Sequence, residues 1–182
     1  MADERIDICD ETNHLTGFQR MKSEAHENGL WHRVAHVWIY NTKGDILIQL
    51  RAKEKLLYPN RWDVSVAGHV GAGEEPLASA LREVQEEIGL TVKEDDLQFF
   101  MIRKVAMVYE NIHNNEFYYV YFLPFDGDIA QVKLQKEEVQ EIRFVSTRWI
   151  TADLKNNPDR YVRHGKYWND AIDGIESILH KK

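Results

Sequence analysis

Three glutamates near the middle of the chain stand at spacings that bring them together on a helix. Glu83, Glu86 and Glu87 occupy positions i, i+3 and i+4, which are neighbouring positions on a helix surface. Carboxylates so close repel one another by about 0.2–0.5 kcal/mol per pair in water. A hard divalent cation such as Mg²⁺ removes this repulsion, because it prefers carboxylate oxygens and commonly shares its shell with phosphates. The triplet therefore indicates a metal–diphosphate site.

The residues around the triplet predict a loop followed by a helix. Three glycines fall within 68–73, where they let the backbone approach a ligand closely. Pro76 suits the first turn of a helix, and Gly89 suits its end. Apolar residues recur along another side of this helix at spacings of four, three and four: Leu77, Leu81, Val84 and Ile88. We therefore expect a helix over 77–88 that packs on a sheet and holds the carboxylates beside a glycine loop.

An acidic run on a helix also has a simpler explanation. On a solvated face, Arg82 would pair with Glu86 at i+4 and no ligand would be involved. The wider pattern argues against that explanation. The segment matches G-x5-E-x7-R-E-U-x-E-E-x-G-U, where U is apolar, at every fixed position: Gly68, Glu74, Arg82, Glu83, Val84, Glu86, Glu87, Gly89 and Leu90. This spacing resembles the Nudix box, the signature of the Nudix hydrolases.

The resemblance implies metal-dependent chemistry at phosphorus. In Nudix hydrolases the box binds Mg²⁺ or Mn²⁺, and the ligands implied here are Glu83, Glu86, Glu87 and the carbonyl of Gly68. Arg82 would pair with Glu74 or with the other carboxylates and hold the helix against the loop. Water would then attack one phosphate of a diphosphate while the metal neutralises charge on its oxygens.

Two glutamates are candidates for the general base that activates the attacking water. Glu86 lies in the box itself. Glu138 lies just before a predicted strand at 141–145, where many Nudix members place an additional glutamate. The sequence leaves both candidates open.

A second group of residues resembles one branch of the superfamily, the isopentenyl-diphosphate isomerases. Residues 51–62 have the spacing Arg-x3-Lys-x3-Pro-x2-Trp, in which Arg51 and Lys55 would bind diphosphate. Taken alone, these two residues would be ordinary surface charges on a loop. Three histidines also occur in the isomerase order, and in the isomerases they help bind the metal: His26, His32 and His69.

Two departures from the isomerase pattern favour hydrolysis. The catalytic cysteine of the isomerases stands directly before Gly-His, and here that position is Ala67, which can neither give nor take a proton. The isomerases also have a degraded Nudix box, whereas this box is intact. We therefore expect the histidines to form hydrogen bonds near the pocket, with a metal contact of any of the three left open, and His36 to be structural.

Composition restricts the class of protein. The 182 residues carry a net charge of −7, which argues against general nucleic-acid binding. Cys9 is the single cysteine, so we expect no intrachain disulfide and a reducing compartment. The chain has no apolar run long enough to span a bilayer and no signal-peptide pattern at residue 1. These features predict a soluble, cytoplasmic protein with one domain over 1–182, including a strand-and-helix extension over about 1–33.

The order of predicted elements indicates the α+β class. Strands are predicted at 5–9, 34–40, 45–50, 62–66, 97–109, 117–123 and 141–145, and helices at 18–28, 77–88, 148–155 and 166–180. We expect a mixed sheet flanked by helices, and the resemblance implies the Nudix α/β/α sandwich. The apolar side of 166–180 could support a homodimer.

The sequence thus predicts a pyrophosphatase that hydrolyses a nucleoside diphosphate-type or other organic diphosphate, a small-molecule substrate. Two alternatives stay open: an enzyme similar to isopentenyl-diphosphate isomerase, and a diphosphate-sensing module without turnover. The identity of the substrate and the oligomeric state do not follow from the sequence.

Overall fold

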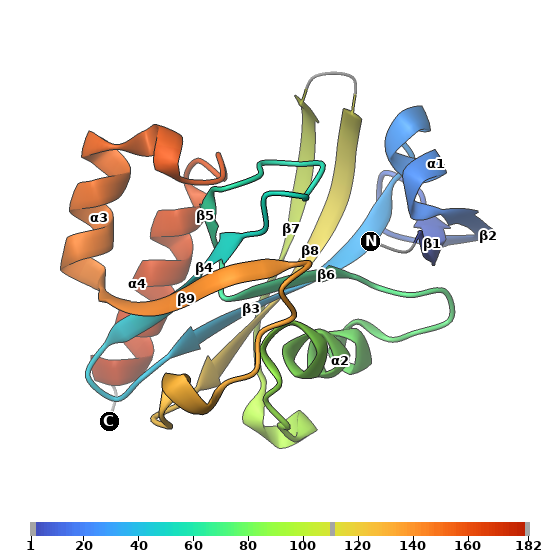
Figure 1. Ribbon diagram of the computed structural model, residues 1–182. Coiled ribbons are helices and arrows are strands. Elements are labelled where there is room, and N and C mark those ends of the chain that lie inside the picture. The colour runs from blue at the N-terminus through green and yellow to red at the C-terminus, as the bar shows by residue number, and fades with distance from the viewer. Residues whose placement is uncertain (1–2, 110–111, 181–182) are drawn as a thin grey trace.

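The computed structural model describes residues 3–109 and 112–180, and a mixed sheet forms the centre of this part of the chain (Figure 1). The strand order is β5-β4-β3-β8-β7, with β6 paired to β3 and β9 paired to β4. β3 and β8 are parallel, and the other pairs are antiparallel. The strands are β3 (His32–Tyr40), β4 (Asp45–Arg51), β5 (Trp62–Asp63), β6 (Val66–His69), β7 (Gln98–Tyr109), β8 (Ile112–Pro124) and β9 (Val139–Ser146).

Helices cover both faces of this sheet (Figure 1). α2 (Pro76–Ile88) packs on one face, and α4 (Tyr167–His180) packs on the other beside α3 (Thr147–Asn156). The alternation along β3 divides the core, because successive side chains of a strand point to opposite faces. Val37 and Ile39 pack with α2, whereas Trp38 packs with α4. The predicted α+β class and the α/β/α sandwich are confirmed.

The helix predicted from the acidic triplet is present, and its ends have the expected residues. Pro76 occupies the first helical turn, and Gly89 ends the helix in the left-handed conformation, with φ of 69°. This conformation suits glycine because it has no Cβ. The bounds of the helix that carries the box side chains are therefore set by strong local signals.

The N-terminal segment differs from the prediction. Its strands β1 (Arg5–Cys9) and β2 (Leu15–Met21) form a two-stranded antiparallel sheet, and α1 (Lys22–Asn28) follows. The helix predicted over 18–28 is therefore wrong for 18–21, which pair with β1. The small sheet is anchored to the glycine loop, because Ala72 N donates to Arg5 O at 2.9 Å and Gly73 N donates to Asp7 at 2.7 Å.

Two further expectations need correction. The strand predicted over 62–66 is divided into β5 and β6, and between them Ser65 Oγ donates to Leu47 O at 2.6 Å and accepts from Ile39 N at 2.8 Å. The strand predicted over 117–123 begins earlier, at Ile112, as part of β8. Residues 110–111 lie outside the described part of the chain. Gly68 lies in β6 rather than in a loop.

Two other expectations concern the cytoplasmic location and the homodimer. Among the described residues, no helix is both long enough and apolar enough to cross a bilayer; the cytoplasmic location stays a prediction. The apolar side of α4 is buried within the chain, through Trp168, Ile172 and Ile175 among others. This face therefore gives no support to the homodimer, which also stays a prediction.

Candidate active site

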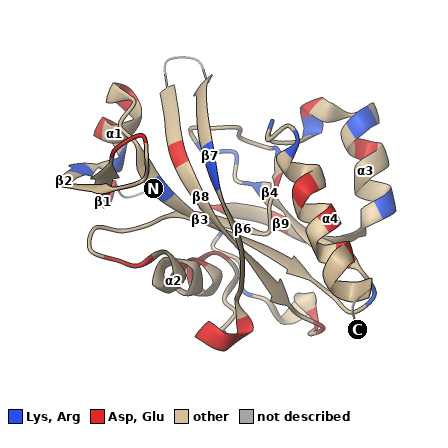
Figure 2. Ribbon diagram, turned by 180° about the vertical axis from the view of Figure 1, so that it is seen from behind, with Lys and Arg blue, Asp and Glu red and all other residues tan. Residues whose placement is uncertain are grey.

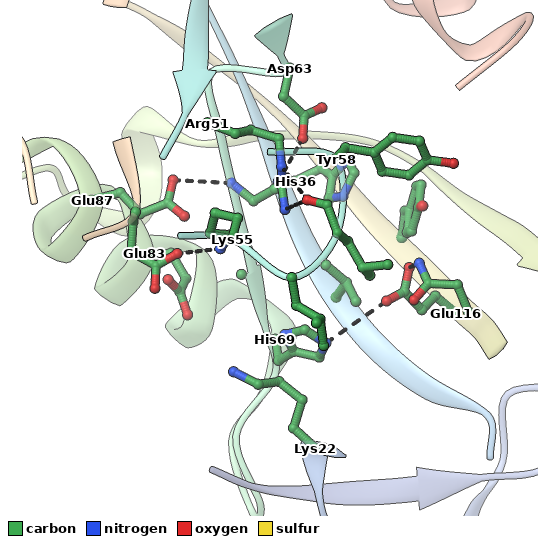
Figure 3. Close-up of a pocket in the computed structure, with 18 of the residues that line it drawn as sticks. Lys22, His36, Arg51, Lys55, Tyr58, Asp63, His69, Glu83, Glu87 and Glu116 are labelled. Carbon is green, nitrogen blue, oxygen red and sulfur yellow. Dashed lines mark hydrogen bonds and ion pairs between the residues drawn. The ribbon is translucent and has the colours of Figure 1, made fainter. Parts of the chain in front are cut away.

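A cavity of about 560 Å³ lies between α2, β6, the 52–61 loop and the sheet (Figure 3). It collects nearly all of the residues to which the sequence assigned chemistry. Acidic residues lie near α2, whereas basic residues lie on β7 and α3 (Figure 2). Basic side chains also line the cavity, among them Arg51, Lys55 and Arg82.

α2 brings all three box glutamates to the cavity, and two of them are buried there. Glu83 is 8% exposed and Glu87 is 3% exposed. Gln49 Nε2 donates to Glu87 Oε2 at 3.2 Å. Burial raises the pKa of Glu83 to about 7 and that of Glu87 to about 8, and the neighbouring Glu83 carboxylate also raises the Glu87 value. Burial disfavours the charged form of both groups, even though Arg82 Nη1 donates to Glu83 Oε1 at 2.7 Å and Lys55 favours the ionised form of Glu87.

Glu86 occupies a different environment from its two neighbours. Its side chain is half exposed and accepts from Arg82 Nη1 at 3.1 Å. Arg82 also contacts Glu74 Oε2 at 3.0 Å and the carbonyl of His69 at 3.1 Å. The guanidinium therefore joins α2 to the glycine loop and to β6, as the sequence predicted. It also keeps Glu86 at the edge of the cavity.

Gly68 is required by a close approach rather than by an unusual backbone conformation. A Cβ atom at this position would lie 1.9 Å from Cδ of Glu83, a separation that no side chain can occupy. The Glu83 carboxyl thus packs directly on the β6 backbone. The carbonyl of Gly68 as a metal ligand stays a prediction.

The two cations predicted to bind diphosphate both line the cavity, and both are already ion-paired. Arg51 Nη1 donates to Asp63 Oδ2 at 2.9 Å. Lys55 contacts Glu138, the second candidate for the general base. The pair with Lys55 places Glu138 near Glu87, whose pKa it helps to raise. Diphosphate would therefore have to compete with these two carboxylates.

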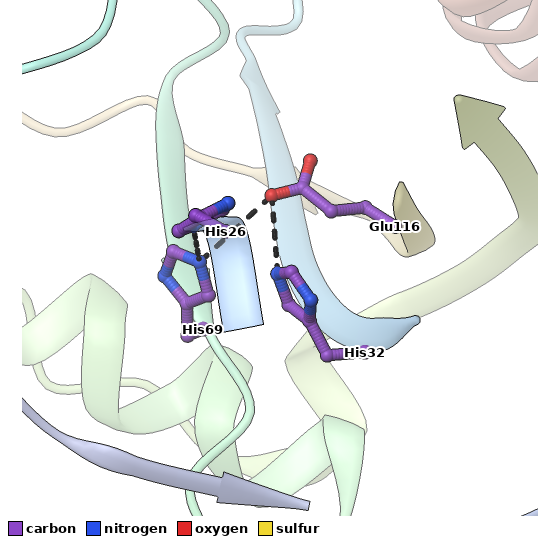
Figure 4. A group of neighbouring side chains, drawn as sticks. All are labelled: His26, His32, His69 and Glu116. Atoms are coloured by element: carbon purple, nitrogen blue, oxygen red, sulfur yellow. Dashed lines mark hydrogen bonds and ion pairs between the residues drawn. The ribbon is translucent and has the colours of Figure 1, made fainter. Parts of the chain in front are cut away.

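The histidines of the isomerase-like pattern converge with a carboxylate that the sequence did not single out (Figure 4). One ligand atom from each residue lies within 4.8 Å of the others in the set His26, His32, His69 and Glu116. His26 Nε2 lies 3.2 Å from His69 Nε2. Asn114 Nδ2 donates to Glu116 Oε2 at 2.7 Å and orients the carboxylate.

The arrangement of this cluster suits a metal ion. His32 Nδ1 lies 2.8 Å from the carbonyl of Leu30 and donates its proton there, so that Nε2 faces the other members of the cluster. That Nε2 is buried and lies 3.4 Å from Glu116 Oε1, a contact marked in Figure 4. Burial, with the nearby His32, lowers the pKa of both His26 and His69. Neutral imidazoles and a carboxylate suit divalent transition metals.

The comparisons with known proteins agree with this geometry. A NUDIX domain model matches residues 30–164. The chain belongs to the NUDIX domain family. It is 36% identical over 167 residues to Nudix hydrolase 3 of Arabidopsis thaliana; the match covers 89% of this chain but only 22% of that protein. It is also 29% identical over 159 residues to an isopentenyl-diphosphate Delta-isomerase of Serratia proteamaculans, covering 87% and 86% of the two chains.

A solved structure shows the same Nudix architecture. The protein DR0079 from Deinococcus radiodurans superposes with a TM-score of 0.70 over 91% of this chain and 98% of its own, at 22% identity. This likeness concerns the fold alone. The family match and the sequence relatives confirm a Nudix hydrolase in a subgroup related to the isomerases. The segment 3–29 precedes the matched Nudix region, yet Glu4, Lys22 and His26 from this segment line the cavity.

Proposed function

We propose that this Nudix hydrolase cleaves the P–O–P link of an organic diphosphate, with water as the nucleophile and a divalent cation as cofactor. The observation that carries the proposal is the pair Glu83 and Glu87, two buried carboxyls with raised pKa values in one cavity wall. Keeping two such groups ionised without a cation is unfavourable. They are better explained as metal ligands than as structural groups.

The residues fit the implied metal. Glu83 and Glu87 would hold it, with Glu86 joining when it leaves Arg82 and the Gly68 carbonyl as a further oxygen. Bound Mg²⁺ or Mn²⁺ would neutralise charge on the phosphate oxygens. Arg82 positions the carboxylates through its contacts with Glu74, Glu83 and the His69 carbonyl.

The pairing of Lys55 with Glu138 suggests how the nucleophile is activated. The ammonium of Lys55 would exchange its carboxylate partner for an oxygen of the incoming diphosphate. Glu138 is then left with an unpaired carboxylate near Glu87, able to accept a proton from water. Glu86 is the other candidate, and its contact with the positively charged Arg82 makes it the weaker base of the two.

The cluster His26, His32, His69 and Glu116 would hold a second divalent cation. The convergence of three imidazoles and one buried carboxylate within 4.8 Å of one another is the structural reason for this assignment. Because three of its four ligands are imidazoles, the site would accept Mn²⁺ or Zn²⁺ more readily than Mg²⁺.

This cluster also supports the rival function, because the similar isomerases bind metal with histidines in this order. Against isomerisation stands Ala67, which pairs with His36 between β6 and β3 and offers no proton-transfer group. Exchange of labelled hydrogen at the allylic carbon of isopentenyl diphosphate would establish the rival.

The hydrolase proposal is tested by phosphate release from a panel of diphosphates with Mg²⁺ and Mn²⁺. We expect Glu83→Gln and Glu87→Gln each to lower kcat by about 10²-fold or more, as for loss of a group that stabilises transition-state charge. Glu75→Gln is the matched control, because this glutamate is exposed at the start of α2. Full activity in both site variants would contradict the proposal. Tight binding without turnover across the panel would favour the sensing module.

A further inference from the structure

Arg51 and Asp63 form an ion pair in the cavity wall, and the guanidinium of Arg51 is held on two sides (Figure 3). Arg51 Nη1 donates to Asp63 Oδ2 at 2.9 Å. Arg51 Nε and Nη2 both donate to the carbonyl of Leu57 in the 52–61 loop, at 3.1 and 3.0 Å. A free arginine side chain loses rotamer entropy when it binds a ligand. Here the contacts with β5 and with the loop have already fixed the side chain.

Asp63 is itself fixed by several donors. It is 3% exposed, and its Oδ1 accepts from Val64 N at 2.8 Å and from His164 Nε2 at 2.7 Å. Because an ionised carboxylate can only accept, the hydrogen of this contact lies on His164 Nε2. Burial opposes ionisation, but His164 and Arg51 favour the carboxylate, and the pKa of Asp63 is lowered overall. Asp63 is therefore an anion in which both oxygens already have partners.

The fold brings His164 to Asp63 from a distant part of the chain. His164 lies 101 positions after Asp63, in the segment between α3 and α4. This segment is hydrogen-bonded to β5, the strand that carries Asp63. The His164 ring lies edge-on to Tyr118 and Tyr167, with centroids 6.0 and 5.4 Å away. The packing of α4 on the sheet thus orients Asp63, and Asp63 in turn orients Arg51.

Arg51 keeps donors for a ligand while it holds these contacts. A guanidinium has five N–H groups, and the contacts with Asp63 and Leu57 use one hydrogen on each of the three nitrogens. One hydrogen on each Nη atom is left, and no other described residue accepts from them. Diphosphate competes with Asp63 for the charge of Arg51, but it does not have to displace the carboxylate. The remaining pair of donors matches phosphate oxygens in geometry as well as in charge.

We propose that Asp63 is a positioning residue of this hydrolase: with His164 behind it, Asp63 holds the Arg51 guanidinium in the orientation in which its two remaining N–H groups receive the diphosphate. The inference rests on the proposed function, in which Arg51 binds a diphosphate. Asp63 differs in this role from Glu138, which leaves Lys55 when the diphosphate arrives. Asp63 stays paired with Arg51 throughout.

The charge of Asp63 taken alone would act in the opposite direction. An anion beside Arg51 repels a diphosphate, so removing the charge while the orientation stayed fixed would tighten binding. Removing the orientation weakens binding, because the ligand then has to order the Arg51 side chain itself. The sign of the change in affinity therefore separates a positioning role from a purely electrostatic one.

The probe is methylenediphosphonate, which has a P–C–P link that hydrolysis of a P–O–P link cannot cleave. Its Kd for the full chain with Mn²⁺ is measured by calorimetry. We expect Asp63→Asn to weaken binding about tenfold. Arg51→Gln should weaken it about 10- to 100-fold. Adding Asp63→Asn to Arg51→Gln should change Kd by less than about threefold, because no guanidinium is left to position.

Asp170→Asn is the matched control. Asp170 also pairs with an arginine, Arg103, at 3.1 Å, and neither residue belongs to the described set that lines the cavity. Because both side chains of this pair are partly exposed, the substitution should leave Kd within about twofold of the wild type.

A second pair of variants covers a failure of Asp63→Asn to fold. His164→Leu removes the donor to Asp63 and should weaken binding about three- to tenfold. His164→Gln should stay within about twofold of the wild type, because its amide N–H can replace the Nε2 donor.

Four results would overturn the inference: unchanged or tighter binding by folded Asp63→Asn, an equal loss from Asp63→Asn in the Arg51→Gln background, equal affinities of His164→Leu and His164→Gln, or no binding of the diphosphonate by the wild type. Calorimetry needs no turnover. Binding that depends on Asp63, without phosphate release from any diphosphate of the panel, would therefore refute the hydrolase proposal alone.

Discussion

Replacing Glu87 by glutamine should stabilise the metal-free protein while it abolishes catalysis. In the fold, the pKa of this carboxyl rises from its ordinary 4.5 to about 8 because the group is buried. The folded state therefore binds the Glu87 proton more tightly than the unfolded state does. Stability from this group is full below pH 4.5 and is lost as the pH rises to about 8. Glutamine has similar shape and no charge to bury.

The structure sets the size of the effect. One pKa unit corresponds to about 1.4 kcal/mol, so ionising Glu87 in the metal-free fold removes at most about 5 kcal/mol above pH 8. Glutamine at position 87 loses the attraction between the ionised carboxylate and the Lys55 ammonium, but its amide oxygen can still accept a hydrogen bond from Gln49. We expect Glu87→Gln to raise the free energy of unfolding by about 2–4 kcal/mol at pH 9 and by less than about 1 kcal/mol at pH 5.

The assay is urea unfolding in the presence of a chelator at pH 5, 7 and 9, for the wild type and for Glu87→Gln. Mn²⁺ added at pH 8 should stabilise the wild type more than the variant, because the ion binds the folded carboxylates. The reasoning would be refuted if Glu87→Gln destabilised the chelated protein at pH 9, or if its gain were the same at every pH.

Two further perturbations address neighbouring groups. Gly68→Ala should lower kcat at least about tenfold and destabilise the fold by about 1–3 kcal/mol, because the new Cβ would overlap the Glu83 carboxyl. Near-wild-type activity and thermal stability of this variant would contradict the close packing of Glu83 on Gly68. His69→Ala should lower the Mn²⁺ or Zn²⁺ bound per chain, measured by atomic emission after dialysis, by about one equivalent; unchanged stoichiometry would rule out the histidine cluster as a metal site.

The part of the site that could be predicted from the sequence is the part set by local signals. The spacing of the box and the two helix ends at Pro76 and Gly89 predicted α2 to within one residue. The contact of Arg82 with Glu74 also follows from that spacing, since both residues belong to the same loop-helix segment. The exposure of Glu86 at the edge of the cavity was not predictable, because it depends on how α2 is rotated against the sheet.

The rest of the site depends on strand register, which periodicity does not determine. Glu116 joins the histidines because β8 pairs in parallel with β3 and places it opposite His32. The pairing of β4 with β5 brings Arg51 into contact with Asp63. The sequence predicted Arg51 to bind diphosphate and did not indicate this carboxylate partner. His36 was expected to be structural; it is buried, and its Nδ1 lies 3.1 Å from the hydroxyl of Tyr167 of α4, a partner that strand periodicity does not determine.

The small N-terminal sheet affects the design of chimeric proteins made from relatives in this family. This sheet is hydrogen-bonded to the glycine loop through Arg5 and Asp7. Lys22 and His26 of the same N-terminal segment line the cavity, although the family match begins only at residue 30. A chimera joined at that boundary would keep the central sheet and α2, but the cavity-lining residues beside His69 would come from the other relative. Exchanging the first thirty residues between relatives is therefore a route to altered metal preference that leaves the Nudix box untouched.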